Sequence, residues 1–116
     1  MVRMITGGVD THADQHVAAA IDANGGVLGT ESFPADVAGY ESLLAWLVSH
    51  GEVERVGVEG TGSWGVGLSR FLHSHDVMVV EVDRPNRQHR RKVGKADDTD
   101  AVSAARAALS GSASVT

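Results

Sequence analysis

The sequence predicts an α/β fold, in which three antiparallel strands are followed by alternating helices and strands. Three observations support this prediction. Short segments near the N-terminus read as strands, an Asn-Gly-Gly turn signal separates two of them, and the hydrophobic spacing then changes to the helical period. A meander followed by helix–strand units gives a mixed sheet flanked by helices.

The first three elements are expected to be strands of an antiparallel meander. They cover residues 4–10, 15–22 and 27–33. The link between the second and third strands is Ala-Asn-Gly-Gly, at residues 23–26, and Asn and Gly tolerate the positive φ of a tight hairpin turn. The first strand ends on an acid, Asp10.

The later elements are expected to alternate between helix and strand. Apolar residues at helical spacing, with Asp36 as N-cap and Gly51 as a C-terminal stop, indicate the first helix. The expected elements are a helix over 36–50, a strand over 53–59, a helix over 64–75, a strand over 77–82 and a helix over 97–109. Trp64 is expected in the core, whereas Trp46 lies off the main apolar stripe of its helix, where it would face a partner.

Composition restricts the classes of protein to consider. The 116 residues allow one domain with one core, and 42% hydrophobic against 22% charged residues is typical of a globular protein. Because the chain has no cysteine, disulfides, thiolate metal sites and a Cys nucleophile are excluded. No apolar run is long enough to span a membrane and the N-terminus lacks the features of a signal peptide, so a cytoplasmic protein without membrane contact is expected.

The charges are unevenly distributed along the chain. The net charge of −5, taken alone, argues against a surface that binds nucleic acid throughout. Residues 84–95, here called the basic segment, contain no acid but hold six of the ten Lys and Arg residues: Arg84, Arg87, Arg90, Arg91, Lys92 and Lys95. Such a run is either a solvated loop or an arm that contacts phosphates. Three aspartates within residues 97–100 follow directly, and they favour the phosphate-contacting arm.

Four acids stand at positions that suit a metal site. Asp10 and Glu59 each end a strand, and sites in open α/β sheets form at the carboxyl ends of strands. Asp97 and Asp100 open the last helix at i, i+3 and so share a face, while Asp98 points elsewhere. Four converging carboxylates repel one another unless a cation neutralises them. Mg²⁺ (or Mn²⁺) takes all-oxygen ligands of this kind, and a pair of such ions supports phosphodiester displacement.

Each acid also has a purely structural explanation. Asp10 would suit a strand-end turn, Glu59 an ion pair with arginine, and an aspartate at a helix start caps the helix. The joint pattern favours the metal site. His12 and His16 have the i, i+4 spacing of zinc ligands on a helix, but they lie in a turn that enters a strand. His12 is either a surface residue or a contact to substrate phosphate.

Five blocks of the sequence, in order, resemble the N-terminal domain of the DEDD transposases. The resemblance is to the insertion-sequence one-ten group, which is related to the pilin-gene invertase, and it runs from Gly7 to Gly111. The blocks are GVDTHADQH, FPADVAGYESLLAWL, VGVEGTGSWGVGLSRFL, VVEVDRPNRQHRR and GKADDTDAVSAARAAL.

This resemblance implies a ribonuclease H-like (RuvC-like) fold, in which the order β-β-β-α-β-α-β-α is usual. It implies that four acids bind divalent metal and act in DNA strand cleavage and exchange. By motif position these acids are Asp10 in GVDTH, Glu59 in VEGTGS, and Asp97 and Asp100 in GKADDTDA. Lys95 matches the lysine that precedes the third acid in the family, and it is expected to contact phosphate. The implied partners are DNA and a structured bridge RNA, with a homo-oligomer in the full-length protein.

The resemblance also implies a division of the protein into domains. Residues 1–111 are expected to form the catalytic domain and residues 112–116 a disordered tail. Members of the family are much longer and carry a second domain with a serine nucleophile, which is expected to follow Gly111 and is absent here. The chain is therefore expected to be a fragment or truncated copy, unable to complete recombination alone.

Two alternatives to a catalytic domain remain open. One is a noncatalytic nucleic-acid-binding relic or partner module, which would bind through the basic segment regardless of the acids. The other is one lobe of an actin-like sugar kinase, because GVDTH at residues 8–12 would mimic its glycine-rich acid motif.

Overall fold

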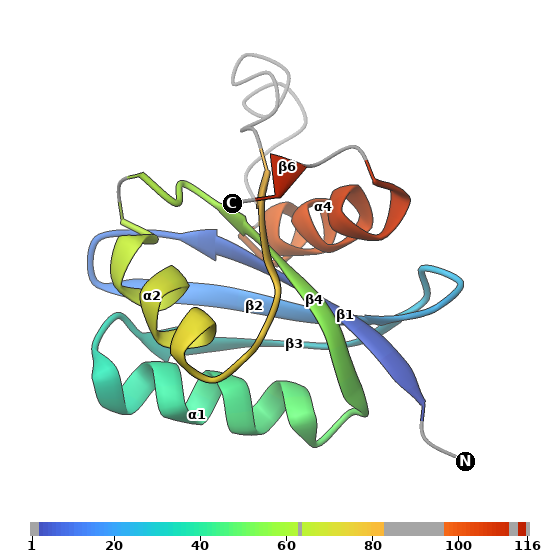
Figure 1. Ribbon diagram of the computed structural model, residues 1–116, viewed down its shortest axis with the longest axis horizontal. Helices are drawn as coiled ribbons and strands as arrows, with labels where there is room; N and C mark the ends of the chain where they lie inside the picture. The colour runs from blue at the N-terminus through green and yellow to red at the C-terminus, as the bar shows by residue number, and fades with distance from the viewer. Residues whose placement is uncertain (1–2, 63, 83–96, 112–113, 116) are drawn as a thin grey trace.

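The computed structural model describes residues 3–62, 64–82, 97–111 and 114–115 (Figure 1). In this part of the chain, six strands form one sheet in the order β3-β2-β1-β4-β5-β6. The strands are β1 (Met4–Thr11), β2 (Gln15–Asp22), β3 (Val27–Pro34), β4 (Glu52–Glu59), β5 (Val79–Val82) and β6 (Ser114–Val115). The helices are α1 (Val37–Val48), α2 (Val66–Ser74) and α4 (Asp97–Ser110).

The sheet is mixed, as the sequence predicts. β1, β2 and β3 form an antiparallel meander, while β1, β4 and β5 run parallel. The hairpin between β2 and β3 has Gly25 at φ +88°, a conformation that glycine adopts without steric cost. Asp22 Oδ1 accepts hydrogen bonds from the backbone N–H groups of Gly26 and Asn24, both at 2.9 Å, and these bonds lower the pKa of Asp22. Because β1, β4 and β5 run parallel, their carboxyl ends lie at the same edge of the sheet.

Helices cover both faces of the sheet (Figure 1). On one face, here called the α1/α2 face, Val9 and Val56 of the central strands pack with Leu47 of α1 and Leu72 of α2. The strand residues on this face alternate with residues that point toward α4. A mixed sheet with helices on both faces is the α/β layered architecture that the sequence predicts.

The opposite face, here called the α4 face, carries a helix that lies very close to the sheet. A Cβ atom added at Gly8 would lie 2.3 Å from the carbonyl oxygen of Ala101, and one added at Gly57 would lie 2.6 Å from that of Ala104. The buried residues of α4 are small, with Ala105 among them. The glycines of β1 and β4 and the alanines of α4 thus bring the helix backbone against the strands.

Two expectations about tryptophan are wrong. Trp64 is 58% exposed, because α2 begins only at Val66 and Trp64 lies in the preceding turn, off the helical face that Leu68 occupies. Trp46 is partly buried on α1 and packs against Phe33, with ring centroids 5.8 Å apart, so it lies against the core and not off the apolar stripe of its helix.

The residues that α1 and α4 bury are spaced along one face of each helix. The buried residues of α1 are Gly39, Leu43 and Leu47, which share one face at a spacing of four residues, whereas Val37 and Val48 lie off this face and are exposed. On α4 the buried stripe consists of alanines instead of the larger residues Val102 and Leu109, which are partly exposed. The buried alanines of α4 are Ala101, Ala104, Ala105 and Ala108.

The end of the chain also differs from expectation. Ser114 and Val115 form the short strand β6, which pairs antiparallel with β5, where a disordered tail over 112–116 was expected. β5 would otherwise be an edge strand with unpaired backbone groups, and a β-branched residue such as Val115 suits pairing there. The basic segment lies outside the described residues. None of the helices in the described part of the chain has the length and hydrophobicity of a membrane span.

Candidate metal centre

Two of the four candidate acids lie side by side at the edge where the parallel strands end. Asp10 of β1 and Glu59 of β4 are register partners in the parallel ladder. Asp10 is 0% and Glu59 1% exposed, although each carries a carboxyl group. Buried charges are costly without compensating contacts, so two such groups on neighbouring strands mark this edge as a candidate site.

Both carboxyl groups point toward the α4 face. Side chains two residues apart in a strand share a face, so Asp10 lies on the face of Gly8 and Glu59 on the face of Gly57. Gly8 and Gly57 are the two glycines whose missing side chains would point into α4. The parallel pairing of β1 and β4 thus gives both acids the same orientation.

A third candidate acid comes from α4. Asp100 is 7% exposed and directly precedes Ala101, whose carbonyl oxygen lies over Gly8. The start of α4 therefore crosses β1 at Gly8, two residues before Asp10. It brings a third buried carboxyl group to the same face of the sheet. Asp97 opens the same helix, but its side chain lies outside the part of the chain whose side chains are described.

The strand ends that carry the acids are tied together. The Thr11 hydroxyl donates a hydrogen bond to the Glu59 carbonyl oxygen at 2.6 Å. Directly after Glu59 the chain turns at Gly60, with φ +83°, and the Gly60 carbonyl oxygen accepts a bond from the Gly65 N–H at 2.9 Å. A Cβ atom at Gly60 would lie 2.8 Å from the Thr11 hydroxyl oxygen. The glycine after the second acid is thus required by both the turn and the close approach of Thr11.

His12 contacts the first acid directly. Its Nε2 atom donates to Asp10 Oδ2 at 3.0 Å, and its ring is partly exposed. The position beside Asp10 in the sequence raised His12 as a candidate for this site, and the structure now gives it a partner there. His16 does not join it, because His16 is buried on the α1/α2 face, where its ring stacks on Tyr40. The i, i+4 histidine pair is therefore no zinc site.

The chemistry of the donor set fits a hard divalent cation. Carboxylate oxygens from Asp10, Glu59 and Asp100 are the ligands that Mg²⁺ and Mn²⁺ prefer, and a cation would offset the repulsion between buried acids. Among the described residues, no three His, Asp or Glu side chains are grouped closely enough to hold a metal ion in this arrangement. Binding therefore requires the carboxyl groups to turn toward a common point, together with any contribution from Asp97.

The residues that sequence reasoning missed are those that support the acids. Gly8, Gly57 and Thr11 hold α4 and the strand ends in place. The Gly7-Gly8 pair before Asp10 and the glycines around Glu59 were a signal in the sequence, but only the register shows that Gly8 and Gly57 face one helix. The six Lys and Arg residues of the basic segment lie outside the described residues.

A family model described as "Transposase", that of the IS110-type DEDD transposases, matches residues 7–116. No curated protein matches the sequence significantly.

Two solved structures share the fold at low sequence identity. The RuvC structure of Thermus thermophilus has a TM-score of 0.66 and 14% identity, covering 97% of this chain and 100% of that one. The Holliday junction resolvase of fowlpox virus has a TM-score of 0.60 and 12% identity, covering 94% of this chain and 99% of that one. These likenesses show a RuvC-like, ribonuclease H-like fold, which confirms the predicted fold class.

Proposed function

Because the chain belongs to the IS110-type DEDD transposase family, we propose that residues 1–111 are the metal-dependent catalytic domain of a DNA transposase. Its carboxyl groups hold divalent cations that support DNA strand cleavage and exchange. One observation carries this proposal: two fully buried acids, Asp10 and Glu59, are register partners on parallel strands and face a helix that presents a third, Asp100.

The roles of the residues follow from their positions. Asp10, Glu59, Asp97 and Asp100 would supply the oxygen ligands of Mg²⁺ or Mn²⁺. The chemistry that such cations supply is the activation of a water or hydroxyl group and the stabilisation of the leaving oxygen of a phosphodiester. His12 holds the Asp10 carboxyl group through the Nε2–Oδ2 hydrogen bond, and its ring is partly exposed.

The described elements that flank the basic segment in the sequence lie at the edge of the sheet that carries the acids. The basic segment follows Val82, the last residue of β5 and the register partner of Glu59, and it precedes Asp97, the first residue of α4. We infer that Arg84, Arg87, Arg90, Arg91, Lys92 and Lys95 contact the phosphate backbone of DNA at this edge. A structured guide RNA and a homo-oligomer are the further partners that the family resemblance implies.

Metal binding and cleavage test the proposal together. The wild-type chain should unfold at a higher temperature when Mg²⁺ or Mn²⁺ is added, because a cation that binds only the folded state stabilises it. It should also bind and nick a branched DNA in a metal-dependent reaction. Asp10→Asn and Glu59→Gln should abolish both effects, whereas Glu31→Gln, which makes the same charge change at an exposed position on β3, should abolish neither.

Two results would overturn the proposal. One is the absence of any metal-dependent shift in the unfolding temperature of the wild-type chain. The other is a shift and a cleavage rate that stay the same in Asp10→Asn, Glu59→Gln and the Glu31→Gln control.

A second candidate is a noncatalytic nucleic-acid-binding module. The concentration of six basic residues within 84–95 favours it, since binding through them requires no metal. It differs from the first in predicting DNA or RNA affinity that is unchanged in Asp10→Asn and Glu59→Gln. The family match gives no support to a lobe of a sugar kinase.

A further inference from the structure

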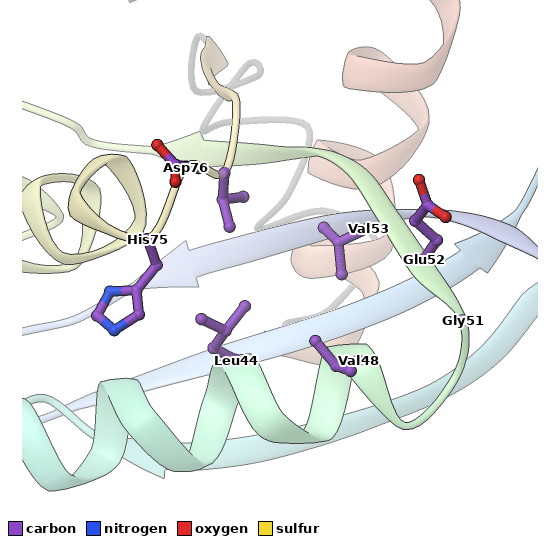
Figure 2. Close-up of a pocket in the computed structure, with 8 residues that line it drawn as sticks. Leu44, Val48, Gly51, Glu52, Val53, His75 and Asp76 are labelled. Carbon is purple, nitrogen blue, oxygen red and sulfur yellow. The ribbon is translucent and has the colours of Figure 1, made fainter.

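A pocket of about 610 Å³ lies at the end of β4 that is remote from the acids. It is formed where α1 ends, where β4 begins and where the chain leaves α2 (Figure 2). Glu52, the first residue of β4, is on its wall, whereas Glu59 is the last residue of that strand. A ligand in this pocket would therefore leave the candidate metal centre accessible.

The middle of the pocket is apolar. Leu44 and Val48 of α1 lie beside Val53 of β4, and Val77 completes the wall. Val48 is 57% exposed, so an apolar side chain that entered the pocket would remove hydrophobic surface from water. A volume of this size lies within the range of natural ligand pockets and admits one or two large side chains.

Carboxylates stand on opposite sides of this apolar centre. Figure 2 shows Asp76 and Glu52 flanking Leu44, Val48 and Val53. Both acids are exposed, and neither forms an ion pair with a Lys or Arg among the described residues. The last turn of α1 contains no basic residue, and that of α2 contains only His73. The negative ends of two helix dipoles thus add to the two carboxylates.

Asp76 is an unfavourable residue for the position that it occupies. Its φ is +62°, and it follows the C-cap of α2 at the place where glycine is usual. The Asp76 N–H donates to the His73 carbonyl oxygen at 3.1 Å, and the Val77 N–H to that of Leu72 at 3.0 Å, which closes the helix end. A side chain costs free energy at this φ, and a negative charge costs more at a helix C-terminus.

We propose that the pocket is a docking site for an amphipathic basic segment of a partner protein. The segment would insert a large apolar side chain between Leu44, Val48 and Val53 and place Lys or Arg beside Glu52 and Asp76. Charge complementarity favours this occupant, because the pocket combines an apolar floor with two carboxylates and two helix C-termini, against a single histidine, His75, on its wall. Such a helix or strand in a groove is a common mode of peptide recognition.

A synthetic amphipathic peptide of leucine and lysine serves as the probe, and a peptide with glutamate in place of lysine serves as its control. Amide shifts of the full chain, recorded by NMR during titration, locate binding. We expect the lysine peptide to shift residues 44–53 and 75–77 and to bind about tenfold more tightly than the glutamate peptide.

Matched variants test the two features of the pocket separately. Val48→Ser, Glu52→Gln and Asp76→Asn should each weaken binding of the lysine peptide, while Glu31→Gln, with the same charge change on β3, should not. Asp76→Gly should weaken binding and at the same time raise the unfolding temperature, because it removes both the strained side chain and the charge. A purely structural Asp76 would give no loss of binding.

Three outcomes would overturn the proposal. Equal binding of the two peptides would remove the charge argument, and shifts centred on Asp10 and Glu59 would show that the peptide is drawn to the acids instead. Shifts at residues 44–53 that grow with protein concentration in the absence of peptide would show that a second copy of the chain occupies the pocket.

Discussion

At the scale of single residues, the buried carboxyl groups of Asp10 and Glu59 are the feature that most needs an explanation. They occupy neighbouring positions on parallel strands and have almost no contact with water. Like charges held this close repel one another, and burial strengthens the repulsion. A cation bound between the two carboxyl groups would offset this repulsion, which is the role proposed for them.

Glu59→Gln should therefore have opposite effects with and without metal. In a chelating buffer the variant should be as stable as the wild type or more stable, by up to about 1 kcal/mol, because one of the repelling charges is gone. In saturating Mg²⁺ it should be less stable than the wild type, because it loses the stabilisation by bound cation. Urea unfolding in the two buffers measures both differences, and a variant equally destabilised in both would contradict this account of Glu59.

A buried histidine outside the candidate site, His16, affects stability. Its Nδ1 atom donates to the Gln15 carbonyl oxygen at 3.1 Å, and Nε2 has no hydrogen-bond partner among the described residues. Burial lowers the pKa of His16 below its ordinary value of 6.5. The folded chain thus keeps this ring neutral at a pH where the unfolded chain protonates it, and protonation favours unfolding.

The free energy of unfolding should consequently fall as the pH drops below about 6.5, with a contribution from His16 of up to about 1.4 kcal/mol per pH unit. This contribution is fully present above that pH. His16→Phe, which keeps a ring to stack on Tyr40, should make the pH dependence shallower, whereas His73→Gln on the exposed surface should not. Unfolding curves between pH 5 and 8 measure the slopes, and equal slopes for all three proteins would exclude His16 as the cause.

At the scale of elements, the position of α4 determines where the third acid lies. The helix approaches the sheet through backbone contacts at Gly8 and Gly57, with alanines as its buried residues. Larger residues at these positions would push α4 outward and carry Asp100 away from the strand ends. The closeness of this packing is thus part of the candidate site.

Gly57→Ala should destabilise the fold, because its Cβ atom would lie 2.6 Å from the Ala104 carbonyl oxygen and 2.9 Å from the Ala108 Cβ. We expect a loss of about 1–3 kcal/mol, typical of overpacking. Gly62→Ala is the matched control, since no atom lies within 4 Å of an added Cβ there. Thermal unfolding measures both, and equal unfolding temperatures would contradict the tight packing of α4.

Element types and order were predictable from the sequence because alternation and helical spacing are strong local signals. β2 has the predicted bounds, and β1, β3 and β4 differ from expectation by one residue at an end. The failures have a common cause in packing between elements. An alanine stripe carries little hydrophobic signal, and the short edge strand β6 forms only because β5 is there to pair with it. Similarly, nothing local shows that Trp64 lies outside the helix that follows.

At the scale of the whole molecule, the fold separates two sets of charges. The candidate acids lie at the carboxyl edge of the parallel strands, and the negatively charged pocket lies at the other end of β4. Asp10, Glu59 and Asp100 could be proposed from strand ends and a helix start. The sequence alone could not predict that these three side chains face the same side of the sheet, because this depends on the register of β1 with β4 and on the approach of α4.

DNA binding should depend on the basic segment and on salt. Changing Arg90, Arg91 and Lys92 to alanine should weaken the binding of branched DNA, whatever the base sequence of that DNA. It should also reduce the slope of log affinity against log salt by about 0.9 for each phosphate contact removed. Fluorescence anisotropy at several salt concentrations measures the slope. An unchanged slope would show that the basic segment does not contact phosphate.

The central claim is that Asp10, Glu59 and Asp100 share a divalent cation. The most direct test is a crystal of the chain soaked in Mn²⁺ and measured by anomalous diffraction. The account predicts an anomalous peak coordinated by the oxygens of these carboxyl groups, and the loss of that peak in Glu59→Gln. A well-ordered site with no peak, or a peak held by other residues, would contradict it.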